Sequence, residues 1–82
     1  MGKKPLDPRV QAICDRLKQL RIEKGYSAES FAYTHELSRQ SYWATERGRD
    51  LKLSTFYRIL DCHQITLEEF LLKTELSENS KN

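Results

Sequence analysis

The sequence predicts an all-α fold, a compact bundle of five helices, and three features support this. The chain has 82 residues, room for one small domain, and such a domain without disulfides is usually stabilised by tightly packed helices, whose local contacts repay the ordering entropy early. Its apolar residues recur at three- and four-residue spacing, which is the helical period. Residues that cap or stop helices stand at the ends of these segments.

A first helix is predicted to begin at Asp7-Pro8, where an N-cap precedes a proline in the first helical position. Gly25 is expected to stop it in a left-handed conformation. One face carries the apolar residues Val10, Ile13, Leu17 and Leu20. The charged residues are expected on the other faces, namely Arg9, Asp15, Lys18 and Arg21.

Two short helices joined by a tight turn are predicted next. Ser27 caps the first, over residues 28–35. After the turn, Ser38 caps the second, which runs to about Arg47 and is ended by Gly48. The side chains expected to point inward are Phe31, Ala32 and His35 from the first helix and Tyr42 and Thr45 from the second.

Two further helices complete the prediction. Ser54 is expected to cap a fourth helix that reaches about His63. Thr66 and Glu69 form a capping box that opens a fifth. Their apolar residues are Phe56, Ile59 and Leu60 in the fourth helix and Phe70 and Leu71 in the fifth. The folded domain is thus predicted over residues 8–73, with a flexible basic arm at 1–7 and a disordered polar tail at 74–82.

Charge is distributed unevenly along the chain, whose formal net charge is +2. Residues 1–58 contain 12 Lys and Arg against 7 Asp and Glu, whereas residues 59–82 contain 2 against 5. This suits a first part that meets a polyanion, although an ordinary surface can show it too. No apolar stretch approaches the ~20 residues that span a bilayer, and no export or lipid signal is visible. We therefore expect a cytoplasmic protein with no membrane partner.

No metal site, cofactor or catalytic activity is expected. Cys14 and Cys62 are far apart in the sequence and are predicted to be reduced structural thiols. Cys62 and His63 are poorly placed to share a metal, since adjacent side chains on a helix diverge by about 100°, and His35 adds no pair at helical spacing. The Ser and His residues are scattered and there is no glycine-rich phosphate loop, so the chain is not predicted to be an enzyme.

The second and third predicted helices indicate a function. Two short helices joined by a tight turn let the second project as a rod narrow enough for the ~12 Å major groove of DNA. The side of this rod away from the core is predicted to carry Gln40, Ala44 and Arg47, with Arg39 and Trp43 on its flanks. Arginine can fork onto guanine, glutamine onto adenine, and alanine or an aromatic ring can contact a thymine methyl. An ordinary solvated helix would show the same residue types, so periodicity leaves both interpretations open.

Several blocks of sequence stand in a characteristic order between residues 13 and 71: LKQLRIEKGYS at 17–27, FA at 31–32, LSRQS at 37–41, ERG at 46–48 and LEEF at 67–70. Their order and spacing resemble the xenobiotic-response-element (XRE) family, the phage Cro- and repressor-like helix-turn-helix domains. The resemblance implies a compact five-helix DNA-binding domain, usually dimeric on palindromic or direct-repeat operators, of the kind found in repressors, mobile-element regulators and antitoxins.

Position by position, the resemblance places the recognition helix on residues 38–47. The base-reading residues that it implies are Arg39, Gln40, Trp43 and Ala44. The implied contacts to the DNA backbone are Ser27, Ser38, Ser41, Arg47, Arg49 and Lys52. Ser27 stands at the start of the second helix, where exposed amides and the helix dipole favour an anion.

The chain departs from the family pattern at several positions. Ala28 replaces a glutamine whose side chain in the family normally bonds the DNA backbone or supports the recognition helix, and Glu36 stands where the turn usually has glycine. A left-handed Glu36 would cost about 1 kcal/mol, so a turn of different shape is an alternative. His35 and His63 occupy positions that are usually apolar, and Trp43 is unusually large for a groove-facing site.

These features together predict a transcriptional regulator, most simply a repressor, that binds double-stranded DNA as a homodimer. Phe70, Leu71 and Leu72 of the fifth helix, or Leu51, are the candidate dimer contacts, although Phe70 and Leu71 could equally close the monomer core. The alternative is an antitoxin or adaptor that holds a toxin or effector protein through Trp43 or the acidic tail.

Overall fold

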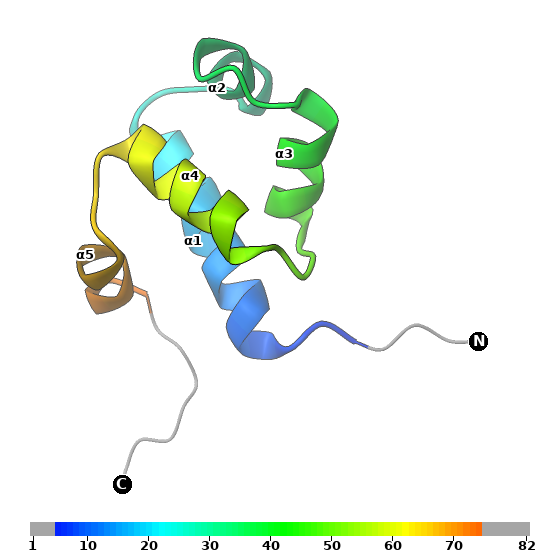
Figure 1. Ribbon diagram of the computed structural model, residues 1–82, viewed down its shortest axis with the longest axis vertical. Helices are drawn as coiled ribbons and strands as arrows, with labels where there is room; N and C mark the ends of the chain where they lie inside the picture. The colour runs from blue at the N-terminus through cyan, green and yellow to red at the C-terminus, as the bar shows by residue number, and fades with distance from the viewer. Residues whose placement is uncertain (1–4, 75–82) are drawn as a thin grey trace, which may run out of the picture.

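Five α-helices and no β-strand make up the part of the chain that the computed structural model describes, residues 5–74. Their bounds are α1 Pro8–Glu23, α2 Ala28–Thr34, α3 Arg39–Arg47, α4 Leu53–His63 and α5 Leu67–Leu72. Figure 1 shows α4 crossing α1 at the centre, with α2 and α3 on one side of this pair and α5 on the other. The five predicted helices are confirmed; residues 1–4 of the predicted arm and 75–82 of the predicted tail lie outside the described residues.

The predicted N-caps of four helices are confirmed. The Asp7 carboxylate accepts a hydrogen bond from the Arg9 amide at 2.8 Å at the start of α1. Ser27 and Ser38 cap α2 and α3 in the same way. In α5 both halves of the predicted capping box are present, with Thr66 as N-cap. These caps form because each needs only a side chain and amides two or three residues away.

The predicted start of α4 is wrong. Ser54 does not cap this helix, because the helix begins at Leu53, two residues before the predicted start. Its N-cap is Lys52, which makes no side-chain capping hydrogen bond. As at the other helix starts, the carbonyl of the N-cap accepts from the amide four residues on, here Lys52 from Phe56 at 3.0 Å. Phe56 is buried and lies edge-on to Phe70, with ring centroids 5.2 Å apart. We infer that packing against α5 sets this helix start in place of a cap.

Four residues adopt the left-handed backbone conformation that favours glycine. Gly25 ends α1 with φ +85°, as predicted, and Gly48 ends α3 with φ +101°. A side chain at Gly48 would also collide with Gln11 of α1. Glu36 has φ +57° and Gln64 has φ +58°. The turn between α2 and α3 therefore keeps the left-handed shape despite the glutamate, and the Arg58 guanidinium donates to the Glu36 carbonyl at 3.0 Å.

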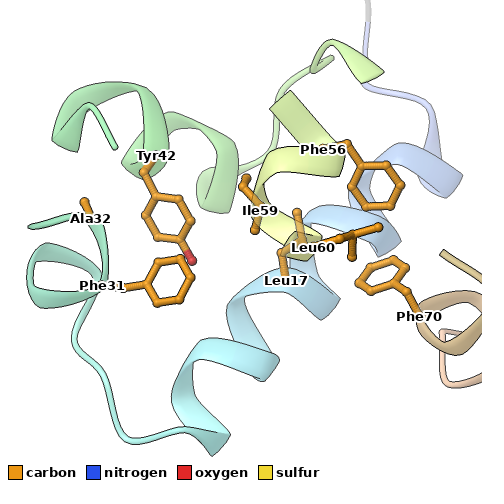
Figure 2. Packing of buried hydrophobic residues seen from close by; sticks show 8 residues of the cluster. All are labelled: Leu17, Phe31, Ala32, Tyr42, Phe56, Ile59, Leu60 and Phe70. Atoms are coloured by element: carbon orange, nitrogen blue, oxygen red, sulfur yellow. The ribbon is translucent and has the colours of Figure 1, made fainter. Parts of the chain in front are cut away.

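A single apolar cluster joins all five helices (Figure 2). Its buried residues are Leu17 from α1, Phe31 and Ala32 from α2, Tyr42 from α3, Phe56, Ile59 and Leu60 from α4, and Phe70 from α5. Phe70 thus closes the monomer core, while Leu71 is 39% exposed and Leu72 is 80% exposed. The sequence left open whether Phe70 and Leu71 close the monomer core or contact a second copy of the chain. The structure places Phe70 in the core and leaves Leu71 partly exposed.

His63 is part of this core although its ring is polar. It is 2% exposed and stacks on Phe31, with centroids 4.8 Å apart and an interplanar angle of 19°. Neither ring nitrogen has a hydrogen-bond partner in the described residues. Burial, reinforced by the nearby charge of Lys24, lowers the pKa of His63 to about 4. The histidine therefore packs as a neutral aromatic ring.

The expectation that Arg21 lies outside the buried face of α1 is wrong. Its guanidinium is buried and forms a bidentate ion pair with Glu46 of α3, at 2.6 Å from Nε to Oε2 and 2.9 Å from Nη2 to Oε1. Nη1 donates to the Tyr26 carbonyl at 2.6 Å. The hydrogen bonds that Arg21 donates to the Glu46 carboxylate raise the pKa of Arg21. This pair joins the C-terminal turns of α1 and α3, and spacing within one helix gives no sign of it.

Both cysteines are free thiols. Cys14 is buried, and its Sγ donates to the Arg49 carbonyl at 3.6 Å. Burial raises the pKa of the thiols of Cys14 and Cys62.

Within residues 5–74, no helix has both the length and the apolar character needed to cross a membrane.

Acid should destabilise the fold through His63. Because the folded-state pKa is about 4 against an ordinary 6.5, the unfolded chain takes up a proton that the folded chain excludes, and stability falls as pH drops from 6.5 to 4. We expect a loss on the order of 2–3 kcal/mol, measured as the free energy of unfolding in urea. His63→Leu should remove this loss, whereas His35→Asn should keep most of it, because burial and Lys24 are the larger causes of the lowered pKa.

Asp7 does not obscure this window. Hydrogen bonds from Arg9 lower the pKa of Asp7 from 3.8 to about 2, so its contribution is lost only at lower pH. A His63→Leu protein whose stability still falls between pH 6.5 and 4 as steeply as that of the wild type would rule out His63 as the cause.

Candidate nucleic-acid interface

The buried face of α3 is the one predicted from helical periodicity. Tyr42 is 2% exposed and Thr45 is fully buried, and Glu46 lies beside them. The opposite side carries exposed Arg39, Gln40, Trp43 and Arg47, with Ala44 half-buried among them. A nine-residue helix thus presents three long polar side chains and an indole to the outside.

Three contacts set the rotation of this helix. The Tyr42 ring packs against Phe31 of α2, with centroids 5.1 Å apart. The Thr45 hydroxyl donates to the Ser41 carbonyl at 3.0 Å, which satisfies its polar group inside the core. Glu46 is held by Arg21 of α1. The Thr45 bond lies within α3, but the contacts of Tyr42 and Glu46 come from two other helices, so the exposed face of α3 is held by the folded core.

The predicted base-reading residues form one surface with a hollow in it. Arg39, Gln40, Trp43 and Arg47 line a shallow groove of about 530 Å³ together with Glu29 of α2. The Trp43 side chain is 53% exposed, and the Arg47 guanidinium lies over its ring at 5.8 Å from the centroid. A cation stacked on an indole in this way is attracted to the face of the ring. Ala44 does not line the groove.

The predicted backbone-contact residues lie on α3, at its two ends or at the start of α2. Ser27 and Arg39 line a neighbouring groove on the α2 side. Ser38 and Ser41 line a small hollow of about 190 Å³ on the α4 side. Arg49 and Lys52 are exposed in the segment that follows α3. The structure therefore arranges the whole predicted set about α3, although Ser27 and Ser38 already use their hydroxyls as helix caps.

Two residues of this surface were not identified from the sequence. Glu29 belongs to the groove and pairs with Arg39, whereas an acidic residue in the first turn of a helix is ordinarily explained by the helix dipole alone. Arg58 of α4 lines the hollow beside Ser41. Both lie far in sequence from the residues they adjoin, so no spacing rule could have identified them.

Among residues 5–74, no group of three or more His, Cys, Asp or Glu residues is placed to hold a metal ion. The chain matches no protein-family model, no curated protein and no solved structure.

Trp43 offers a direct test of this surface, since it is the one tryptophan of the chain. Its half-exposed ring should give red-shifted fluorescence in the free protein, and Trp43→Ala should leave the thermal midpoint nearly unchanged because little buried contact is lost. Tyr42→Ala, one residue earlier and buried, is the matched control and should unfold the domain or lower its midpoint strongly. A blue-shifted emission combined with unfolding of Trp43→Ala would mean that α3 is rotated differently.

Proposed function

We propose that this protein binds double-stranded DNA sequence-specifically and regulates transcription, with α2 and α3 acting as a helix-turn-helix of the phage-repressor type and α3 as its recognition helix. The observation that carries this proposal is the outer face of α3: exposed Arg39, Gln40, Trp43 and Arg47 on a short helix whose rotation is held by buried contacts. A rigid helix with an arginine, a glutamine and an aromatic ring outward has the groups needed to read base edges.

Each of these side chains has a defined task in the proposal. A nine-residue helix is about 13 Å long, so it reaches a few base pairs when it enters the major groove. Arg39 forks onto a guanine and Gln40 onto an adenine. Trp43 and Ala44 contact a thymine methyl or a sugar.

Sequence-independent affinity comes from the residues around the groove. Arg47, Arg49 and Lys52 neutralise phosphates on the side where α3 ends, and binding releases the counterions condensed there. Ser41 and the helix caps Ser27 and Ser38 orient the domain on the backbone.

A single recognition helix reads too few base pairs for useful discrimination, so we propose a homodimer that spans two half-sites. The α5 side is the proposed contact. Leu72 is 80% exposed there, and it lines a groove of about 210 Å³ between α1 and α5 with Leu20 and Ile65. Figure 1 places α5 on the side of α1 and α4 opposite α3, so a dimer formed through α5 leaves both recognition helices uncovered.

The second candidate is a module that binds a toxin or effector protein, and the exposed Trp43 is the observation that favours it. A half-exposed tryptophan with an arginine stacked on it has the composition of an interface hot spot. The fluorescence of Trp43 separates the candidates, because it should change on adding cognate duplex if DNA is the partner. A shift caused by a partner protein and by no duplex would favour the second candidate.

Selection of bound duplexes from a random pool, followed by affinity measurements at several salt concentrations, tests the DNA proposal. For three phosphate contacts, affinity should fall about 40-fold between roughly 50 and 200 mM salt. Arg39→Ala or Gln40→Ala should cost about 1–3 kcal/mol on the selected duplex and relax base preference, whereas Arg49→Ala should weaken all duplexes alike. The proposal fails if no duplex is enriched or if affinity does not depend on salt.

Sedimentation tests the dimer through Leu72. Leu72→Glu should shift the protein towards monomer without lowering its stability, because an 80% exposed side chain contributes little to the core. Leu53→Glu on α4, where the native side chain is 71% exposed, is the matched control and should leave the dimer intact. A wild type that stays monomeric at high concentration, even with the selected duplex, would exclude the dimer.

A further inference from the structure

The contact that leads beyond the proposed function is an ion pair between α2 and α3. The Arg39 Nη1 donates to the Glu29 Oε2 at 2.7 Å, and the two side chains are 64% and 70% exposed. Within residues 5–74, no other member of the predicted DNA-contacting set makes an ion pair. The one carboxylate of the groove therefore holds the arginine assigned to a guanine.

The geometry of the pair leaves Arg39 able to read a base. Glu29 engages Nη1 alone, so the edge formed by Nε and Nη2 stays available. Two parallel N–H groups on one edge of a guanidinium are what a bidentate contact to guanine O6 and N7 requires. An arginine held from behind also has less rotamer freedom to lose on binding than an unrestrained one.

The charge of Glu29 lowers the affinity for DNA of any sequence, although its contact with Arg39 favours the reading of guanine. A carboxylate in a groove that faces phosphates is repelled by DNA of any sequence. It also keeps Arg39 from turning to a phosphate when the base in front of it is not guanine. Repulsion that is equal for every sequence leaves the ratio of affinities unchanged. The ratio rises because Arg39, while paired with Glu29, is kept from a phosphate contact that would stabilise the complex with a wrong base.

We infer that Glu29 is a specificity-determining positioning residue, which holds Arg39 for a guanine and penalises binding to other sequences. The inference rests on the proposed function of α3. It concerns the ratio of affinities for two duplexes and not the ability to bind DNA, so the two can fail separately.

Two substitutions separate the contact from the charge. Glu29→Asp keeps the negative charge at the start of α2 and shortens the side chain by one methylene, which breaks the 2.7 Å contact. Glu29→Gln keeps the length and removes the charge. Glu36→Gln removes the same charge from the turn between α2 and α3 without touching Arg39, and glutamine is compatible with its left-handed backbone because Gln64 adopts one in this chain.

The probes are a duplex selected from a random pool, the same duplex with each G·C pair replaced in turn by A·T, and an unrelated duplex. Binding is measured by fluorescence anisotropy, and the thermal midpoint of each variant confirms folding. The wild type should discriminate at least about 5-fold at the guanine read by Arg39. Both Glu29 variants should lose most of this discrimination, and Arg39→Ala should lose all of it. In the Arg39→Ala background, a second change at Glu29 should have no effect on discrimination.

The unrelated duplex reports on the charge. Glu29→Gln and Glu36→Gln should each bind it more tightly than the wild type does, whereas Glu29→Asp should not. If Glu29→Asp and Glu29→Gln discriminate as well as the wild type, the inference is wrong and the pair is an ordinary surface contact. If the wild type binds no duplex, the proposed function fails first and the role of Glu29 with it.

Discussion

The buried ion pair between Arg21 and Glu46 is the constraint on which the arrangement of this molecule depends. In residues 5–74 it is the one ion pair with both side chains buried, and the Tyr26 carbonyl takes a further N–H of the guanidinium. Removing one partner would leave a charge in the core, which typically costs about 3–5 kcal/mol. The pair therefore fixes the C-terminal turn of α3 against α1 with little tolerance for rotation.

That fixed rotation determines what α3 presents to its surroundings. Glu46 is bound and Tyr42 and Thr45 are packed inside, so the remaining positions of the helix must face outward. A second groove beside Trp43 is lined by Lys18 and Arg47 together with Asp15 and with both partners of the buried pair, so the pair borders the exposed surface. A site on a helix anchored in this way loses little ordering entropy when it binds a ligand, which favours discrimination between similar ligands.

Phe31 has a comparable role for α2. Its ring lies within 5.5 Å, centroid to centroid, of Tyr26, His35, Tyr42 and His63, which belong to the segment before α2, the end of α2, α3 and α4. A seven-residue helix cannot be stable by itself, and this aromatic cluster supplies the tertiary contact it needs. His63 stacks on Phe31 in this cluster, and the burial is costly because neither of its ring nitrogens has a hydrogen-bond partner within residues 5–74.

The features of this fold that depend on interactions between residues close together in the sequence were predictable. Those that depend on contacts between residues far apart in the sequence were not. The caps at Asp7, Ser27, Ser38 and Thr66, the stop at Gly25 and the inward face of α3 depend on residues a few positions apart, so their pattern is visible in the sequence. The start of α4, the burial of Arg21 and the pairing of Glu29 with Arg39 depend on groups that meet only after folding. The partner of Arg21 is 25 residues away. A prediction from sequence places a charged helix residue on the surface unless it can identify such a partner.

The sequence alone determined which residues of α3 could form an interface. Only the tertiary structure decided which carboxylate and which cations stand beside these residues, because those neighbours come from other helices.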